Sequence, residues 1–321
     1  MIKEENISQC IVDIYRLAYD LPIADFKQAA MNRFSELINV DMGFWITRSE
    51  IETPFFDEDS FTYNLPEGVM QHYIEISSVS KTAQEISGYL FANLNKTYDV
   101  QEIIPEERFK NSDIYLIHCK KYDLEHAMVT MTFNPNSMII NAFSFVRGES
   151  KQNFTKEERE IKQFIVPNLV EALRINLIKS INDDSKSKHS VRGIVDKHGK
   201  IIESEERFED LMKEYGMLSD NTVDLDLLSS NRFSEKNKVS MSNHDGLVYI
   251  EIIKASIKDQ LSKRKLAVCQ LLCKGLSNKE IARELFISQD AVSNHMKEIN
   301  KALNVTSRYQ AIAVLSEQDL M

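Results

Sequence analysis

The sequence predicts an α+β region followed by an all-α domain, and three observations support this division. Residues 1–150 combine helical apolar spacing with alternating strand patterns and contain the single tryptophan, Trp45. Residues 190–256 form a second, shorter block of strands and helix. Residues 261–315 show only helical patterns, separated by turn and capping residues. We therefore expect a two-part α+β region and a final domain of four helices.

The first block has helices followed by strands. Apolar residues recur at helical spacing in Ile7–Leu21 and Ala24–Ile38, whereas Met42–Thr47, His126–Phe133 and Met138–Val146 are typical of strands. The segment Asn134–Ser137 has the composition of a hairpin loop and separates the last two strands.

A long helix is expected after this block. Thr155 and Glu158 have the spacing of a capping box, and apolar residues then recur every three or four positions to Ile181. Pro167 lies inside this pattern and predicts a kink. The helix is a candidate for dimerisation, although its apolar face could instead pack on its own first block, and both can hold at once. The polar run Asn182–His189 indicates a linker.

The second block begins with a strand, a tight turn and a strand over Gly193–Ile202. We expect Ser204 to cap a helix that reaches about Tyr215, and Leu247–Ile253 to form a later strand.

The final segment has strong local signals for helix ends. A helix over Ser262–Lys274 is followed by Gly275, which accepts the left-handed conformation that ends helices. Ser277 and Glu280 form a second capping box, and Ser288 is expected to cap the third helix. A fourth helix is predicted over roughly residues 307–316.

Charge is unevenly distributed along the chain. The net charge is −10, yet residues 261–315 contain nine Lys/Arg and four Asp/Glu, so they carry +5 and the remainder carries −15. A basic module on an acidic body indicates a nucleic-acid partner for the module. No apolar run approaches the ~20 residues of a membrane helix, so we expect a cytoplasmic protein without a membrane partner.

The final segment resembles the LuxR-type helix-turn-helix family in Gly275–Ala282, Leu285–Ser288, Val292–His295 and Leu303–Arg308. Two departures stand out. Lys265 occupies the place of a glutamate in the family's first capping box, and Asp290 and Ser293 stand where relatives often carry lysine. The resemblance implies that the third helix enters the major groove of double-stranded DNA. It assigns base reading to Ser293, Asn294 and Lys297, and phosphate contacts to Asn278, Lys279, Gln289, Lys301 and Arg308.

The rest of the chain resembles the sensor regions of larger LuxR-type regulators. The first block is similar to GAF-like domains through Asn64–Tyr73, Asp113–Glu125 and Phe154–Leu173, and residues 190–256 are similar to a shortened PAS fold. We thus expect four parts: a GAF-like α+β domain at 1–153, a connecting or dimerisation helix and linker at 154–189, a short PAS-like domain at 190–256, and the helix-turn-helix domain at 257–321.

A ligand cavity in the first block would have aromatic walls, although such residues are more often plain core. The candidate wall residues are Phe44, Trp45, Phe61, Tyr63, Tyr73 and Phe91. Receptors for acyl-homoserine lactones carry an Asp-Pro pair where this chain has Glu75–Ser80, which argues against a homoserine lactone. His118, Cys119 and His126 lack regular metal-ligand spacing, and we expect neither a metal nor a cofactor.

These features together predict a dimeric, sequence-specific transcription regulator that senses a small molecule through its N-terminal region. The alternative is a ligand-independent regulator whose N-terminal region binds another protein, and RNA polymerase is a further candidate partner. We expect no enzyme activity, because the sequence shows no nucleophile elbow, phosphate loop, metal-binding helix or pair of catalytic acids.

Overall fold

The computed structural model describes residues 2–49, 60–135, 139–182, 190–228, 230, 233, 237–254, 261–303 and 305–316. The chain divides into two compact units, one of Met1–Leu225 with Ser240–Glu251 and one of Asp226–Val239 with Ile252–Met321. Residues 183–189 of the expected linker, and residues 136 and 137 of the expected hairpin loop, lie outside the described residues. The four-part division of the chain stays a prediction.

The described part of the first unit contains a five-stranded sheet in the order β2-β1-β5-β4-β3, with antiparallel neighbours throughout. Its strands are β1 (Met42–Arg48), β2 (Phe61–Tyr63), β3 (Lys96–Asp99), β4 (His126–Asn134) and β5 (Ile139–Arg147). The three strands predicted from the sequence are confirmed to within one residue at each end. Alternation along β1, β4 and β5 sends successive side chains to opposite faces of this sheet.

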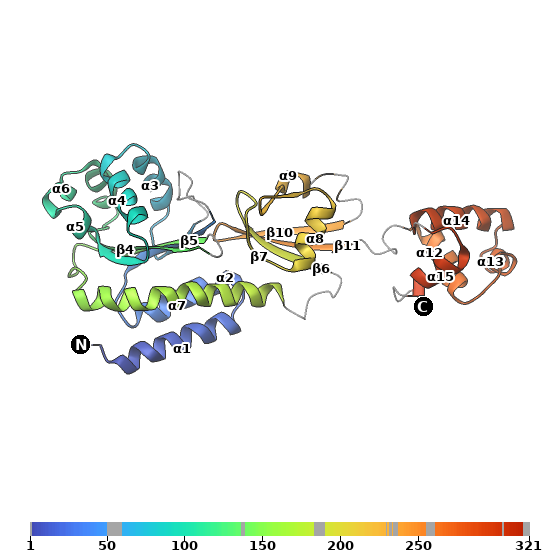
Figure 1. Ribbon diagram of the computed structural model, residues 1–321, viewed down its shortest axis with the longest axis horizontal. Coiled ribbons are helices and arrows are strands. Elements are labelled where there is room, and N and C mark those ends of the chain that lie inside the picture. Colours follow the sequence, from blue (N-terminus) through green and yellow to red (C-terminus); the bar gives the residue numbers. More distant parts are fainter. Residues whose placement is uncertain are drawn as a thin grey trace. The chain divides into compact units, whose positions relative to one another are not determined.

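One face of the sheet is covered by α1 (Glu4–Asp20), α2 (Ile23–Ser35) and α7 (Lys156–Ile181) (Figure 1). Thr155 and Glu158 form the predicted capping box, and α7 continues through Pro167. The apolar face of α7 packs in the same core cluster as Trp45 and Phe145, and that cluster also contains buried residues of α1 and α2. The alternative in which this face packs on its own first block is therefore confirmed.

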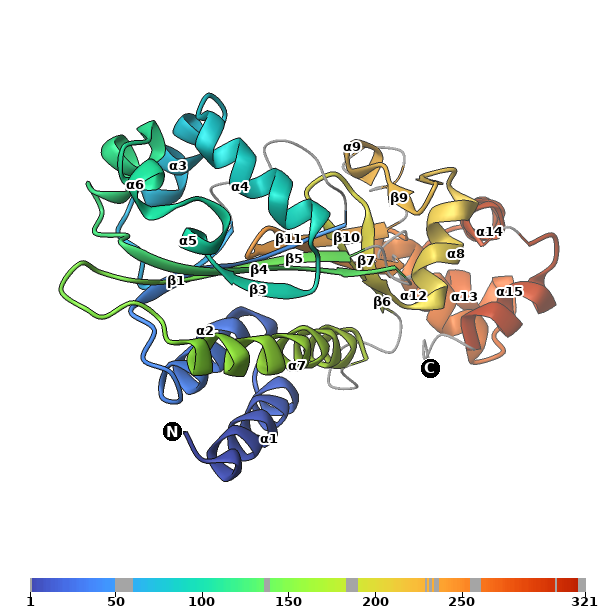
Figure 2. The same cartoon turned by 60° about the vertical axis from the view of Figure 1, so that its left-hand side comes forward.

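The opposite face of the sheet is covered by short helices (Figure 2). These are α3 (Val69–Ser77), α4 (Lys81–Ala92), α5 (Val100–Ile103), α6 (Glu106–Lys110) and the π-helical turn η1 (Ile114–Cys119). A second core cluster forms here, in which Ile46 of β1 packs with Val129 and Met131 of β4. The two faces of one sheet therefore support two separate cores.

A four-stranded sheet in the order β10-β11-β6-β7 follows along the chain. Its strands are β6 (Ser190–Asp196), β7 (Ile201–Ser204), β10 (Asn237–His244) and β11 (Leu247–Lys254). The described residues between β7 and β10 include α8 (Glu206–Glu214), β8 (Leu218–Ser219), β9 (Thr222–Val223) and α9 (Leu225–Leu228). The predicted cap at Ser204 is wrong. The N-cap is Glu205, and its side chain makes no capping hydrogen bond. The Ser204 hydroxyl does not cap the helix and donates to the Glu209 carboxylate at 2.8 Å.

The C-terminal domain is helical and comprises α12 (Lys263–Cys273), α13 (Asn278–Glu284), α14 (Gln289–Ala302) and α15 (Arg308–Ser316). Gly275 has a φ of +83° after α12, as its left-handed role requires. Ser277 and Glu280 form the predicted capping box, and the Ser288 side chain accepts from the Ala291 amide. A buried apolar cluster joins these helices. No described helix is long and apolar enough to span a bilayer.

Candidate functional site

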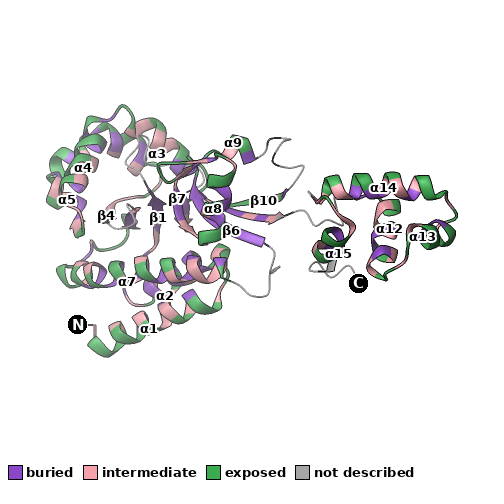
Figure 3. Cartoon of the chain, turned by 45° about the vertical axis from the view of Figure 1, so that its right-hand side comes forward, coloured by how far each residue is buried: buried purple, intermediate pink, exposed green. Residues whose placement is uncertain are grey.

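Helix α14 presents one apolar and one polar face. Val292, Met296 and Ile299 point into the domain core, since each is at most 8% exposed. On the other side Asn294 and Lys297, both predicted to read bases, are exposed. Figure 3 shows exposed and buried segments alternating along α14. The packing of the inner face fixes the rotation of the helix, and this rotation in turn fixes which polar side chains reach outward.

The remaining predicted base-reading residue is engaged within its own helix. Ser293 is half-buried, and its hydroxyl donates to the Gln289 carbonyl at 3.0 Å. Its oxygen can still accept a hydrogen bond from outside, but its donor is in use. Of the three predicted base-reading residues, Asn294 and Lys297 therefore have the more available side chains.

The predicted phosphate contacts fall into two groups. Lys279, Gln289 and Lys301 are exposed. Asn278 and Arg308 are half-buried and bind each other, because Arg308 Nη1 donates to Asn278 Oδ1 at 2.9 Å and Nη2 donates to the Leu276 carbonyl. Arg308 thus braces the start of α15 against the start of α13, in addition to carrying a positive charge toward any phosphate.

Exchanging Arg308 for lysine separates these two roles. Lysine keeps the charge but lacks the planar fork that reaches both oxygens, so Arg308→Lys is expected to destabilise the packing of α13 by about 1–2 kcal/mol. Hydrogen-exchange mass spectrometry on the full chain should show roughly 5- to 30-fold faster exchange in α13. Lys301→Arg on exposed α14 is the matched control and should leave α13 unchanged. Unaltered exchange in Arg308→Lys would show that the brace contributes nothing.

A second brace, which sequence reasoning missed, holds α14 from behind. Although Lys265 takes the place of the family's capping glutamate, the Ser262 side chain still accepts from the Lys265 amide. Lys265 Nζ pairs instead with Glu298 of α14 at 2.8 Å. This lysine lowers the pKa of the Glu298 carboxyl, first through the hydrogen bond and then through its charge. The presence of an oppositely charged residue, Glu298, on α14 is the feature of the sequence that could have predicted this ion pair.

A cavity of about 780 Å³ lies on the face of the first sheet that carries the short helices. Of the six candidate wall residues, Phe44, Tyr73 and Phe91 line it, whereas Trp45, Phe61 and Tyr63 belong to the core cluster on the opposite face. Trp45 follows Phe44 on β1, so the two must point to opposite faces. Phe61 and Tyr63 pair in register with Trp45 and Gly43 and therefore share the Trp45 face.

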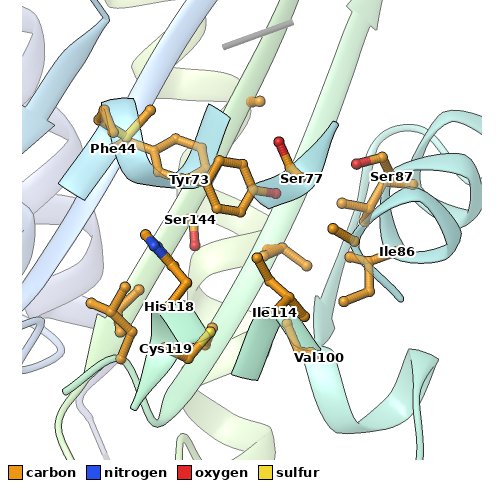
Figure 4. Close-up of a pocket in the computed structure, with 18 of the residues that line it drawn as sticks. Phe44, Tyr73, Ser77, Ile86, Ser87, Val100, Ile114, His118, Cys119 and Ser144 are labelled. Carbon is orange, nitrogen blue, oxygen red and sulfur yellow. The ribbon is translucent and has the colours of Figure 1, made fainter. Parts of the chain in front are cut away.

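The cavity walls are mainly apolar, with a few hydroxyl groups and one histidine (Figure 4). The polar members labelled there are Tyr73, Ser77, Ser87, His118, Cys119 and Ser144. Burial is the main cause that lowers the pKa of His118 to about 4, with further contributions from His72 and Lys121. Burial likewise raises the pKa of the Cys119 thiol to about 12. Both groups are therefore neutral at physiological pH.

His118 and Cys119 were considered with His126 as a metal site. Across the described ranges, no group of three or more His, Cys, Asp or Glu side chains is placed to hold a metal ion. His118 instead contacts His72, with 3.1 Å between their Nδ1 atoms. This pairing joins two helices far apart in sequence, and spacing along the chain gave no sign of it.

The C-terminal segment matches a known protein family and individual proteins of known sequence. Residues 259–315 match the family "Bacterial regulatory proteins, luxR family". The spore germination protein GerE of Bacillus subtilis is 43% identical over 58 residues, which cover 78% of that protein and 18% of this chain. The nitrate/nitrite response regulator protein homolog of Haemophilus influenzae is 41% identical over 61 residues, or 19% of this chain and 29% of the Haemophilus protein. The match thus spans less than a third of that relative.

Among solved structures, Escherichia coli SdiA aligns over 98% of both chains with a TM-score of 0.37 and 12% sequence identity.

Proposed function

Because the chain belongs to the luxR family of bacterial regulatory proteins, we propose that it is a sequence-specific, dimeric transcription regulator that senses a small molecule in its N-terminal α/β domain. The observation that carries the DNA-binding part is the outer face of α14, where Asn294, Lys297 and Lys301 are exposed on a helix whose rotation is fixed by its buried face. The net charge of +5 on residues 261–315 supports the same role.

In the proposed complex α14 lies in the major groove. Asn294 can bind adenine through two hydrogen bonds, and Lys297 can donate to the acceptors of guanine. Lys279, Gln289 and Lys301 would contact phosphates, which set affinity and orientation but not sequence. Asn278 and Arg308 contribute mainly by bracing α13, with the charge of Arg308 adding to the attraction for phosphates.

We propose a dimer because a single domain of this size gives a small footprint on DNA. Paired half-sites about one helical turn, ~34 Å, apart would supply the remaining affinity. The apolar face of α7 is used within its own chain, so a dimer surface on this helix would use its exposed side chains, such as Phe164, which is 61% exposed.

Selection of bound sequences from a random double-stranded DNA pool tests the DNA-binding proposal on the full chain. We expect an enriched motif with two half-sites, and we expect the enrichment to disappear in a variant that combines Asn294→Ala and Lys297→Ala. The control variant, Lys213→Ala at an exposed residue of α8, should enrich the same motif as the parent. Absence of enrichment in the parent chain would overturn the proposal.

The cavity supports the sensing part of the proposal, since its size and mainly apolar lining suit a small organic molecule. A ligand at one hundred times its dissociation constant should stabilise the chain by about 2.7 kcal/mol, which is visible as a rise in melting temperature. We expect a metabolite panel to contain such a ligand, and we expect Ser144→Phe, which fills the cavity, to abolish the shift. A panel without any hit, together with a directly identified protein partner of residues 1–181, would favour the ligand-independent alternative.

A further inference from the structure

His118 is one of the two most enclosed polar side chains on the cavity wall, together with Thr130, and it lies on a π-helical turn. It is 2% exposed, and its ring is surrounded by those of His72, Tyr73 and Tyr122, with centroid separations of 5.2, 5.4 and 5.3 Å. Figure 4 shows it between Tyr73 and Cys119 on the cavity wall. π-Helical turns cost regular hydrogen bonding and are frequent at functional sites, so the placement of His118 on η1 invites a functional explanation.

The contact between the two histidines limits the protonation states of the pair. Only one hydrogen can lie between two Nδ1 atoms that are 3.1 Å apart, so one ring donates and the other accepts. Two imidazolium rings would place two N–H groups face to face, and burial, which lowers the pKa of His118, keeps its ring neutral. Its Nε2 then has a fixed donor or acceptor role, and among the described residues the ring of His118 makes its hydrogen bond through Nδ1 alone.

The charges of the residues around the cavity favour an uncharged ligand. Among the residues that line the cavity there is no lysine or arginine, and the one acidic residue, Glu75, is exposed. Lys121, which also acts on His118, places its Nζ 4.8 Å from the centre of the Tyr122 ring and is not part of the lining. A carboxylate in the cavity would therefore be buried without a partner, which costs several kcal/mol.

We propose that His118, held by His72, is the polar anchor of this cavity and selects an uncharged ligand, a mainly apolar molecule that carries a hydroxyl or carbonyl oxygen. The proposal rests on the proposed sensing role of the cavity and specifies its chemistry. The neutral imidazole supplies one hydrogen bond without a counter-charge, and the apolar walls take up the rest of the molecule. His72 acts as a positioning residue, because it fixes the ring of His118 from the side away from the ligand.

Isothermal titration of the full chain at neutral pH with matched ten-carbon probes tests this inference. We expect decan-1-ol and decan-2-one to bind, and decanoate to bind at least tenfold more weakly than either. His118→Leu should lose about tenfold in affinity for decan-1-ol while retaining its affinity for decane, because only the hydrogen bond is removed. The matched control His295→Leu, outside the cavity, should bind all probes like the parent. His72→Phe should reduce decan-1-ol binding less than His118→Leu and supplies a second test if His118→Leu fails to fold.

The outcomes separate the inference from the proposed function. Equal binding of decanoate and decan-1-ol, or unchanged decan-1-ol binding in both histidine variants, would overturn the role of His118 and leave the sensing role standing. If none of the probes binds, decane included, the cavity does not take up apolar molecules, and the sensing role and this inference both fall.

Discussion

Replacing Asn294 with alanine is expected to lower affinity for the selected operator by roughly tenfold or more while leaving affinity for unrelated DNA unchanged. The side chain is exposed on the outer face of α14 and can form a bidentate pair with adenine, an interaction worth about 1–3 kcal/mol of discrimination. Fluorescence anisotropy with the operator, and with duplexes altered one base pair at a time, measures the change. The loss should be confined to one position in each half-site.

Lys279→Ala is the matched comparison, because Lys279 is also exposed but lies at the start of α13. Because Lys279 is a proposed phosphate contact, its loss should weaken binding to every duplex by a similar factor. The slope of log affinity against log salt concentration should fall by about one for each DNA-binding domain. If the two variants respond identically across the altered duplexes, the division into base-reading and phosphate-binding residues is incorrect.

The second large effect is expected at Lys27, a cation buried in the first unit. Its side chain is 2% exposed, and its Nζ lies 3.7 Å from Asp245 Oδ2 and 5.6 Å from the centre of the Trp45 ring. Within the described residues this nitrogen has no hydrogen-bond partner. Burial lowers the pKa of Lys27 to about 8, and Arg48 adds to this, while Asp245 offsets part of it.

This shift predicts a rise in stability with pH. Between about pH 8 and the ordinary lysine value of 10.5, the folded chain has lost the proton that the unfolded chain still holds. The free energy of unfolding therefore gains about 3 kcal/mol from Lys27 across that window, and below it the full cost of the buried charge remains. Lys27→Met should remove this contribution, so its stability advantage over the parent should shrink by about 3 kcal/mol from pH 8 to 10.5.

Urea unfolding at each pH, followed by the fluorescence of Trp45, measures the free energy of unfolding of parent and variant. Trp45 is the single tryptophan and lies next to Lys27. Tyrosine and cysteine side chains with raised pKa values act in the opposite direction at alkaline pH, among them Tyr115, which is hydrogen-bonded to Glu125, and the buried Cys10, so the signal is the difference between parent and variant. Lys156→Met, at an exposed lysine of α7, is the control and should run parallel to the parent. Parallel pH profiles for Lys27→Met and the parent would contradict the prediction.

Sequence reasoning succeeded where the relevant contacts are close along the chain. Ser277 and Glu280 lie three residues apart, so their reciprocal bonds could be predicted from spacing alone, and the same holds for Thr155 and Glu158. It failed at Ser204 because a competing local bond to Glu209 was available to the same hydroxyl. Aromatic composition alone could not distinguish cavity residues from core residues, since Phe44 and Trp45 are adjacent and differ only in the face they reach.

The sequence by itself determined strands β1, β4 and β5, the capped starts of α7, α13 and α14, and the basic C-terminal module with its helix-turn-helix pattern, because caps, turns and apolar periodicity act over a few residues. Only the tertiary structure decided which aromatic residues line the cavity, that His72 meets His118, and that Arg308 is bound to Asn278. Each of these depends on elements brought together across many intervening residues. Their meeting is set by the burial of two faces of one sheet and of the inner faces of the helices, which no local spacing encodes.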